Sequence, residues 1–238
     1  MPHARNSKKN ARPSSLCCNF LSRSAAVQGN CLTRAVVRAA VLSTTLLFSA
    51  CGDTPRLAEL DDDAVILAFG DSLTYGTGAK RHQSYPAVLE NLTGITVVNA
   101  GLPGEESDAG LRRLPKAVAD EMPDLVILCH GGNDFLRKRP RENTEKNLRS
   151  MIDYLRAQDI PVVLLGVPEF GLLLSTADVY HLIADELDVP LEDDIIPDLL
   201  GQNKYKSDHV HPNADGYRLM AKAIRDLLVD SGALVTAE

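Results

Sequence analysis

The sequence contains no tryptophan and few other aromatic residues. Its 238 residues include six tyrosines and five phenylalanines. Binding sites for sugars tend to be lined by aromatic rings, which offer a large flat apolar surface. This scarcity therefore argues against an enzyme whose substrate is a carbohydrate.

The chain also lacks a pair of cysteines that could crosslink its main part. Of the five cysteines, Cys17, Cys18 and Cys31 lie near the N-terminus, Cys51 follows, and Cys129 stands in an apolar run. Without a disulfide, a domain must be held together by its hydrophobic core. We expect Cys129 to be a small buried hydrophobic residue of that core.

The first fifty residues contain no acidic residue and no apolar run long enough to cross a membrane. They hold seven lysines and arginines, followed by an apolar stretch at 39–50 that a few serines and threonines interrupt. A membrane-spanning helix needs about 20 apolar residues. A run of about a dozen after a basic segment is typical of a signal peptide, so residues 1–51 are predicted to be a signal peptide that ends in Cys51.

The leader ends in LFSAC at 47–51, which resembles the lipobox of bacterial lipoproteins. The resemblance implies that Cys51 is lipidated and becomes the new N-terminus, although Phe48 departs from the usual aliphatic residue. An ordinary secretory signal cleaved near Ala50, or a disordered basic leader, is the alternative. We expect export to the cell envelope, with the lipid anchor in a bacterial membrane facing the periplasm.

Loss of the leader would leave a strongly acidic protein. Without those seven cations, 18 lysines and arginines stand against 32 acidic residues, a net charge of −14 instead of −7. Nucleic acids bind basic surfaces, so a domain with this charge is a poor partner for them and no nucleic-acid partner is expected. Residues 52–63, GDTPRLAELDDD, are polar and show no period, and they are predicted to tether a domain at 64–238.

Apolar runs alternate with amphipathic stretches through this domain. Short apolar runs predict strands at 64–69, 95–98, 125–129 and 160–165. Helical spacing predicts helices at 85–92, 108–121, 143–158, 176–187 and 213–229, with Pro115 expected to kink or split the second. Alternation of this kind predicts an α/β fold, a flavodoxin-like three-layer α/β/α sandwich with a central parallel sheet of about five strands.

Polar or glycine-rich blocks follow three of the predicted strands. They are GDSLT at 70–74, NAGLPG at 99–104 and GGND at 131–134, and a fourth block, SDHVHP at 207–212, precedes the last helix. The carboxyl ends of parallel strands meet at one edge of a sheet, where ligands bind. Ser72 is either an N-cap there or a nucleophile. The step from Asp208 to His211 lets a carboxylate orient an imidazole.

The four blocks resemble those of the SGNH family of GDSL hydrolases, in the family's order. The blocks NAGLPGEES and LVILCHGGNDFLR are most similar to the bacterial thioesterase/lysophospholipase and arylesterase branch. The resemblance implies that Ser72 is the nucleophile, His211 the base and Asp208 its partner. It also implies an oxyanion hole formed by backbone N–H groups of Ser72 and Gly104 and the side chain of Asn133.

The resemblance implies hydrolysis of carboxylic esters or thioesters of acyl chains through an acyl-enzyme. The substrate would be a small acyl ester or a lipid, with no cofactor and no metal, since the HVH of 209–211 lacks further ligands at metal spacing. A carbohydrate O-deacetylase on the same fold, or an envelope lipoprotein without catalysis, remains as an alternative. The sequence gives no indication of the oligomeric state.

Other residues near the blocks have structural interpretations. Asp71 is expected to cap its turn, Asp134 to stabilise its own loop and His130 to be a hydrogen-bonded strand-end histidine, while His209 competes with His211 as the base. The apolar run at 172–174 either forms a wall for an acyl chain or packs under the next helix; its members are Leu172, Leu173 and Leu174. The basic residues after GGND either attract an anionic headgroup or form a solvated face; they are Arg137, Lys138, Arg139 and Arg141.

Overall fold

A central parallel sheet organises the computed structural model, which describes residues 54–169 and 174–235. The sheet has five strands in the order β2-β1-β3-β4-β7, and each neighbouring pair is parallel. The strands are β1 (Val65–Gly70), β2 (Thr96–Gly101), β3 (Leu125–Cys129), β4 (Val162–Leu165) and β7 (Leu191–Glu192). A short antiparallel pair, β5 (Pro168–Glu169) and β6 (Ser175–Thr176), follows β4.

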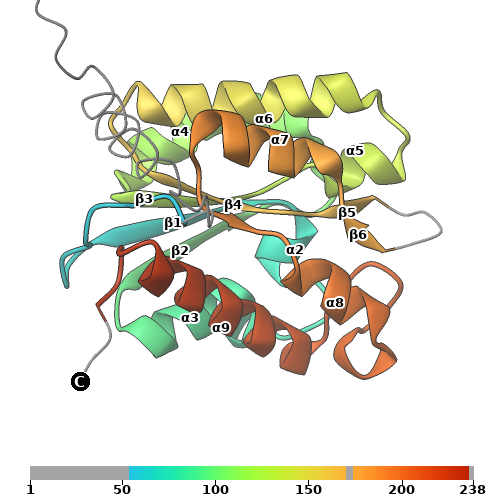
Figure 1. Cartoon of the computed structure of the whole chain (residues 1–238). Coiled ribbons are helices and arrows are strands. Elements are labelled where there is room, and N and C mark those ends of the chain that lie inside the picture. Colours follow the sequence, from blue (N-terminus) through green and yellow to red (C-terminus); the bar gives the residue numbers. More distant parts are fainter. Residues whose placement is uncertain (1–53, 170–173, 236–238) are drawn as a thin grey trace, which may run out of the picture. The chain divides into compact units, whose positions relative to one another are not determined.

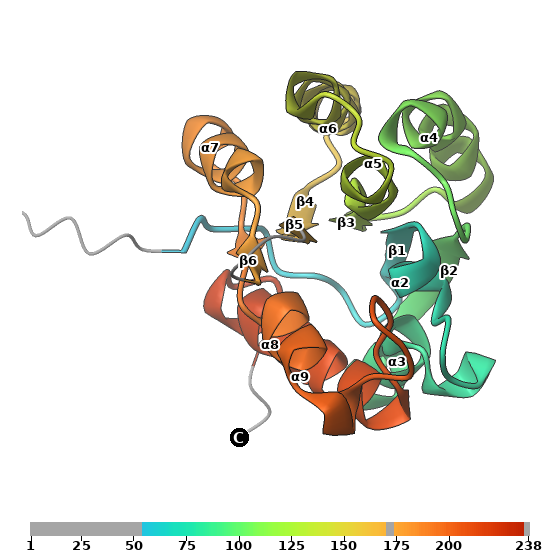
Figure 2. The same ribbon diagram turned by 90° about the vertical axis from the view of Figure 1, so that its right-hand side faces the viewer.

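Helices cover both faces of the sheet (Figures 1 and 2). One layer contains α4 (Ser107–Glu121), α5 (Gly132–Leu136), α6 (Arg141–Arg156) and α7 (Asp178–Leu187). The other contains α3 (Tyr85–Thr93), α8 (Ile195–Gly201) and α9 (Ala214–Asp230). Single turns complete the described chain: α2 (Ser72–Tyr75) and two 3₁₀ turns, η1 (Arg81–Gln83) and η2 (Asn203–Tyr205). The predicted three-layer α/β/α fold is confirmed.

The core lies on both sides of the central strands. Every residue of β3, and every residue of β1 after Val65, is buried. A strand that is covered on both faces must be apolar throughout, which is why both strands stand out in the sequence as unbroken runs. The edge strand β7 has two half-buried residues and no such run, so sequence patterning did not locate it.

Helix α4 continues through Pro115, so the predicted splitting of this helix is wrong. A proline inside a helix lacks the N–H that would bond to the preceding turn. Leu114 and Val118, on either side of it, are both buried against the core. Their burial holds the two halves of the helix to the same surface.

The segment predicted as a free tether is partly bound to the domain. The backbone N–H of Leu57 donates to Ser231 O at 2.9 Å, and that of Leu60 donates to Ala233 O at 3.0 Å. Both leucine side chains pack against the core. The tether prediction is therefore wrong for this stretch, because its two leucines find an apolar surface.

The predicted leader with Cys51 lies outside the described residues, and within them no helix is long and apolar enough to span a membrane.

Gly101 at the end of β2 allows α2 to approach the sheet. A Cβ here would lie 2.1 Å from Tyr75 N and 2.7 Å from Thr74 C, which are backbone atoms that cannot move aside. We expect Gly101→Ala to cost about 3 kcal/mol of folding free energy and to lower the melting temperature by roughly 6 to 12 °C. Thermal unfolding followed by circular dichroism measures this shift.

Gly201→Ala is the matched control, because a Cβ there would have no neighbouring atom of the described residues within 4 Å. It should leave the melting temperature nearly unchanged. Equal shifts for the two variants would show that close approach of α2 is not what requires glycine at position 101.

Candidate active site

The structure brings Ser72, His211 and Asp208 into one hydrogen-bonded chain. Ser72 opens α2 directly after β1, and His211 lies in the loop before α9, 139 residues later. The Oγ atom of Ser72 is 2.9 Å from Nε2 of His211. On the other side of the ring, Nδ1 is 2.8 Å from Oδ2 of Asp208. A hydroxyl, an imidazole and a carboxylate thus stand in the order that nucleophilic catalysis requires.

The loop that carries Asp208 fixes the direction of its carboxylate. The second oxygen, Oδ1, accepts hydrogen bonds from the backbone N–H groups of Val210 at 2.8 Å and His211 at 2.9 Å. Partial burial would raise the pKa of Asp208, but these bonds and the neighbouring imidazole outweigh it and hold that pKa below its usual value. The carboxylate is therefore ionised at neutral pH and directed at the ring.

Asp71 caps the turn that presents Ser72, as predicted. Its Oδ1 accepts from Leu73 N at 3.0 Å, and its Oδ2 accepts from Nδ2 of Asn133 at 3.0 Å. Burial raises the pKa of this almost fully enclosed carboxyl, and the two hydrogen bonds oppose that rise. Asp71 thereby ties the start of α2 to α5.

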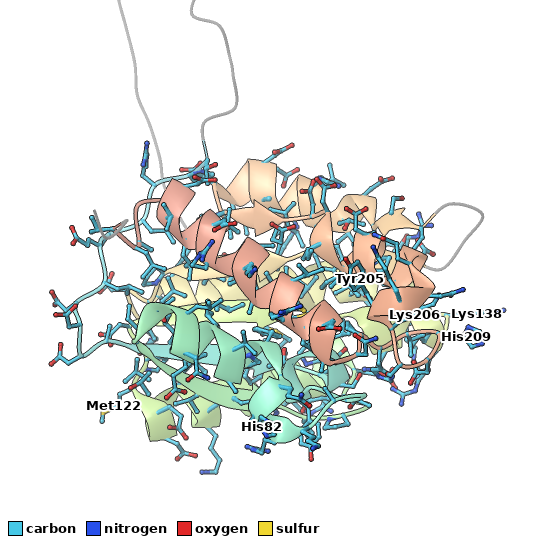
Figure 3. All side chains as sticks on the ribbon, turned by 90° about the horizontal axis from the view of Figure 1, so that it is seen from below. His82, Met122, Lys138, Tyr205, Lys206 and His209 are labelled. Atoms are coloured by element: carbon cyan, nitrogen blue, oxygen red, sulfur yellow. The ribbon has the colours of Figure 1, made fainter. Side chains whose placement is uncertain are left out.

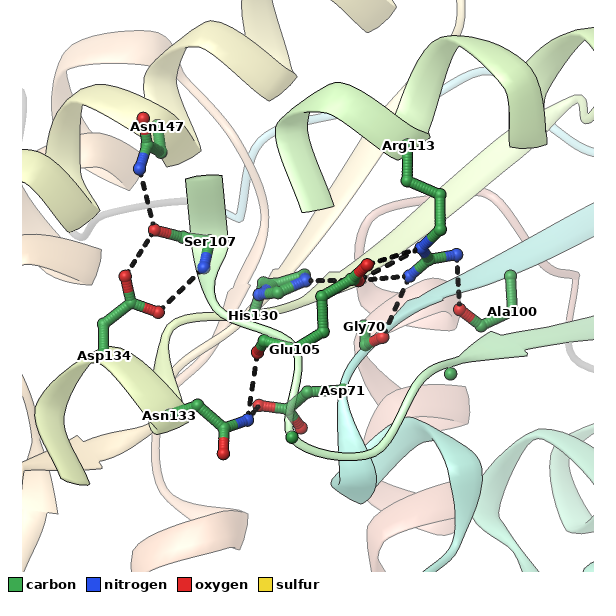
Figure 4. Close-up of polar contacts among 12 residues, drawn as sticks. Gly70, Asp71, Ala100, Glu105, Ser107, Arg113, His130, Asn133, Asp134 and Asn147 are labelled. Atoms are coloured by element: carbon green, nitrogen blue, oxygen red, sulfur yellow. Dashed lines mark hydrogen bonds and ion pairs between the residues drawn. The ribbon is translucent and has the colours of Figure 1, made fainter. Parts of the chain in front are cut away.

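Asn133 lies on α5, and both hydrogens of its amide already have acceptors (Figure 4). Besides Asp71, its Nδ2 donates to the backbone oxygen of Glu105 at 3.0 Å. Because both neighbours are acceptors, the amide nitrogen must face them. An oxyanion bound by Asn133 would have to share one of these hydrogens.

Gly104 adopts a left-handed backbone conformation, with φ of +78°. A Cβ added there would come no closer than 3.7 Å to another described protein atom, Nη2 of Arg137. Within the described protein, glycine is therefore favoured by the backbone conformation and not by lack of space.

A cavity of about 220 Å³ lies between these residues. Its polar lining includes Ser72, Asn133 and His211. Its apolar lining comes from several loops and helices: Leu73, Pro103, Leu136, Val167, Pro168, Leu200 and Val210. Leu174 packs against the core instead, so the acyl-wall interpretation is wrong for that residue, and Leu172 and Leu173 lie outside the described residues.

Residues 68–219 match the family model for the GDSL-like lipase/acylhydrolase family. The chain belongs to this family. The matched region runs from β1 to α9 and contains all four sequence blocks. Membership makes the chain an SGNH-type hydrolase, a class of enzymes that act on ester bonds.

Relatives support the predicted branch of the family. The chain is 32% identical to the esterase TesA of Pseudomonas aeruginosa over 70% of this chain and 89% of that protein. It is 29% identical to an arylesterase of Vibrio mimicus, over 69% of this chain and 88% of the relative. A crystal structure of TesA superposes with a TM-score of 0.63 and 28% identity, covering 69% of this chain and 97% of that one. The resemblance to the thioesterase/lysophospholipase and arylesterase branch is confirmed.

Two polar residues of this GDSL-like domain bind partners from other loops. His130 is buried at the end of β3, and its Nε2 is 3.1 Å from Oε2 of Glu105, as expected for a hydrogen-bonded strand-end histidine. Asp134 accepts from the backbone N–H of Ser107 at 2.8 Å and from its hydroxyl at 2.6 Å. The prediction that Asp134 stabilises its own loop is therefore wrong, because it satisfies the open N-terminus of α4 instead.

The basic residues that follow GGND are largely paired. Arg137 and Arg139 bind Glu106, and Arg141 binds Glu169. This pairing favours a solvated face over a site for an anionic headgroup.

His209 is exposed and lies at the same edge of the molecule as Lys138 and Lys206 (Figure 3). The imidazole hydrogen-bonded to Ser72 is that of His211. Among residues 54–169 and 174–235, no cluster of three or more potential metal ligands is present.

Sequence reasoning missed the buried pair of Glu105 and Arg113. The Glu105 side chain is only 4% exposed and lies 2.5 Å from Nη2 of Arg113. Burial alone would raise its pKa, but hydrogen bonds from His130 and Arg113 lower the pKa of Glu105 to about 2. The only sequence signal is two charged residues eight positions apart around the start of α4, which is weak.

This lowered pKa predicts a loss of stability in acid. The pKa of Glu105 lies below its usual 4.5 in the folded state, so its stabilisation is complete above pH 4.5 and is lost as the pH falls towards 2. Between pH 5 and pH 3 the free energy of unfolding should fall by about 2 kcal/mol more in the wild type than in Glu105→Gln. Urea unfolding of both proteins at these two pH values measures the difference, and parallel losses would contradict the assignment.

Proposed function

We propose that this domain is a serine esterase that hydrolyses acyl esters or thioesters through an acyl-enzyme. The observation that carries the proposal is the hydrogen-bonded chain from Ser72 through His211 to Asp208 at an apolar cavity. The family's activity and the relatives described as esterase and arylesterase support it.

The first half of the reaction follows from the three side chains. Nε2 of His211 takes the proton of Ser72 Oγ as that oxygen attacks the substrate carbonyl. Asp208 stabilises the imidazolium that forms. The negative oxygen of the tetrahedral intermediate is bound by the N–H groups of Ser72 and Gly104 and by Asn133, which shares one of its two hydrogen bonds.

The second half uses the same residues in reverse. His211 gives its proton to the departing alcohol or thiol, which leaves the acyl group on Ser72. Water then enters, His211 takes a proton from it, and the acyl-enzyme is hydrolysed. The free acid departs and Ser72 regains its proton.

The cavity supports a small acyl group as substrate. Seven of its lining residues are apolar, which suits a hydrocarbon chain. Its volume of about 220 Å³ lies below the range of roughly 300 to 1,000 Å³ that is usual for sites enclosing larger ligands. Short acyl chains therefore fit inside, and longer chains would extend into solvent.

A panel of p-nitrophenyl esters from acetate to palmitate, with a lysophospholipid and an acyl-CoA, tests the function and its substrate. We expect hydrolysis, with kcat/KM highest for short acyl chains. A kcat/KM that rises steadily to palmitate would contradict the cavity argument. A folded wild type that hydrolyses none of these compounds would contradict the esterase.

Export and lipidation of Cys51 form a separate part of the proposal, supported by the basic leader and the LFSAC sequence. Leu57 is bound to the domain, and the six residues from Cys51 to it reach at most about 20 Å when extended. The anchor would thus hold the domain close to the membrane. Mass spectrometry of the N-terminal peptide from membranes tests this, and an unmodified Cys51 would contradict it.

A further inference from the structure

Three charged or polar side chains form a hydrogen-bonded cluster next to Asn133, one of the proposed oxyanion donors (Figure 4). Its members are Glu105, Arg113 and His130, which we call the oxyanion-loop cluster. The Glu105 and His130 side chains are almost fully buried, and that of Arg113 is 26% exposed. The mechanism above uses none of these three side chains. Burial of a charged group costs free energy unless a hydrogen-bonding or oppositely charged partner binds it.

Arg113 reaches from α4 to the ends of two strands. Its Nη2 donates to Gly70 O at 3.2 Å, and its Nη1 donates to Ala100 O at 3.1 Å. Gly70 ends β1 two residues before Ser72, and Ala100 lies near the end of β2, just before the loop of Gly104. The guanidinium also lies 4.1 Å above the ring of Phe69. The planar guanidinium, with its several donors, binds these two carbonyls and a carboxylate at the same time.

His130 brings the third loop into the cluster. It follows β3 directly and lies three residues before Asn133. Its Nε2 is bound to the same Glu105 oxygen that Arg113 binds. Helix α4 packs closely on the ring, since a Cβ at Gly110 would be 2.3 Å from Nε2.

Glu105 connects the cluster to the donors themselves. It follows Gly104 in the chain, and its backbone oxygen accepts from Nδ2 of Asn133. Glu105 therefore holds the N–H of Gly104 in place through its side chain and orients the amide of Asn133 through its backbone carbonyl. Ser72, Gly104 and Asn133 lie in the segments that follow β1, β2 and β3, and the cluster binds all three segments.

We propose that Glu105, Arg113 and His130 are positioning residues: their hydrogen bonds connect the three segments that carry the oxyanion donors and fix the geometry of the oxyanion hole. This inference rests on the proposed esterase function. Oxyanion donors are effective because they are already aligned before charge develops. Loosening them should weaken binding of the transition state more than binding of the ester, so kcat should fall while KM changes little.

The test compares Arg113→Met, Arg113→Lys and Glu105→Gln with Arg149→Met as a matched control. Arg149 is 24% exposed and binds two carboxylates, Glu145 and Glu186, between α6 and α7, away from the cavity. The substrate is p-nitrophenyl acetate, and active sites are counted with a fluorophosphonate. Phenylboronic acid, which forms a tetrahedral adduct with an active serine, reports on the hole without turnover.

We expect kcat per active site to fall about 10- to 100-fold in Arg113→Met and Glu105→Gln, with KM changed less than about threefold. The inhibition constant of phenylboronic acid should rise with the loss of kcat. Arg113→Lys should be intermediate, and Arg149→Met should keep the wild-type kcat whatever its melting temperature.

Three results would overturn the inference. If the wild type is active and kcat is unchanged in both Arg113→Met and Glu105→Gln, the inference is overturned and the proposed esterase function stands. Failure of both variants to fold, with Arg149→Met folded, would assign the cluster a purely structural role. A wild type without esterase activity would overturn the proposed function and this inference with it.

Discussion

Ser72→Ala and His211→Ala are each expected to lower kcat for ester hydrolysis by about 10⁴-fold or more. Alanine at 72 removes the oxygen that attacks the carbonyl. Alanine at 211 removes the group that takes the proton of that oxygen, 2.9 Å away. Since the two side chains act in one step, the double variant should be no slower than either single variant. Steady-state kinetics with p-nitrophenyl acetate measures all three.

His209→Ala serves as the control for the histidine. His209 is exposed and lies two residues from His211, so its side chain would be the base only if this loop were arranged differently. It should retain activity within about twofold, a difference of under 0.5 kcal/mol in the barrier. If His209→Ala lost activity and His211→Ala kept it, the assignment of the base would be wrong.

Asp208→Asn is expected to lower kcat by about 10³- to 10⁴-fold with little change in KM. An amide can present its N–H to Nδ1 of His211, which would leave the proton on Nε2 and remove the acceptor for Ser72. It also lacks the negative charge that stabilises the imidazolium. Half of the Asp208 side chain is exposed to solvent, which supports an effect at the lower end of this range.

Asp215→Asn is the matched control for the carboxylate. Asp215 is a similarly exposed aspartate in the first turn of α9, and it binds Arg218. Its replacement should leave kcat within about twofold of the wild type. A loss of activity in Asp208→Asn that was no larger than in this control would remove Asp208 from the mechanism.

The parts of the fold that the sequence predicted are those governed by local patterns. Strand β3 matches its predicted range of 125–129, because its five residues are all buried and all apolar. Helix α9 begins within one residue of the prediction, since Asn213 caps it by accepting from two backbone N–H groups. Patterns of this kind are set within a few residues and need no knowledge of the rest of the chain.

What the sequence missed depends on contacts between distant segments. Helix α8 and strand β7 are short, and their burial is decided by neighbours far along the chain. The binding of Leu57 and Leu60 to the C-terminal segment is likewise non-local. Two leucines in a polar stretch do not indicate which surface of the protein they will pack against.

The residues of the site also divide into those that local sequence patterns predict and those that depend on contacts between distant segments. The four blocks identified the residues that meet at the cavity, because each block is contiguous in sequence. The cluster of Glu105, Arg113 and His130 has one member in each of three segments, and charged residues in a sequence are ordinarily exposed. The fold reveals that these three side chains bind one another, and that the backbone of Glu105 binds the proposed oxyanion donor Asn133.

The most direct test is to locate the covalent adduct formed by a fluorophosphonate on the wild-type domain. Tandem mass spectrometry of the digested protein should place one adduct on Ser72, and Ser72→Ala should remain unlabelled. An adduct on another residue, or a folded wild type that does not react, would contradict the central claim that His211 activates Ser72 as the nucleophile.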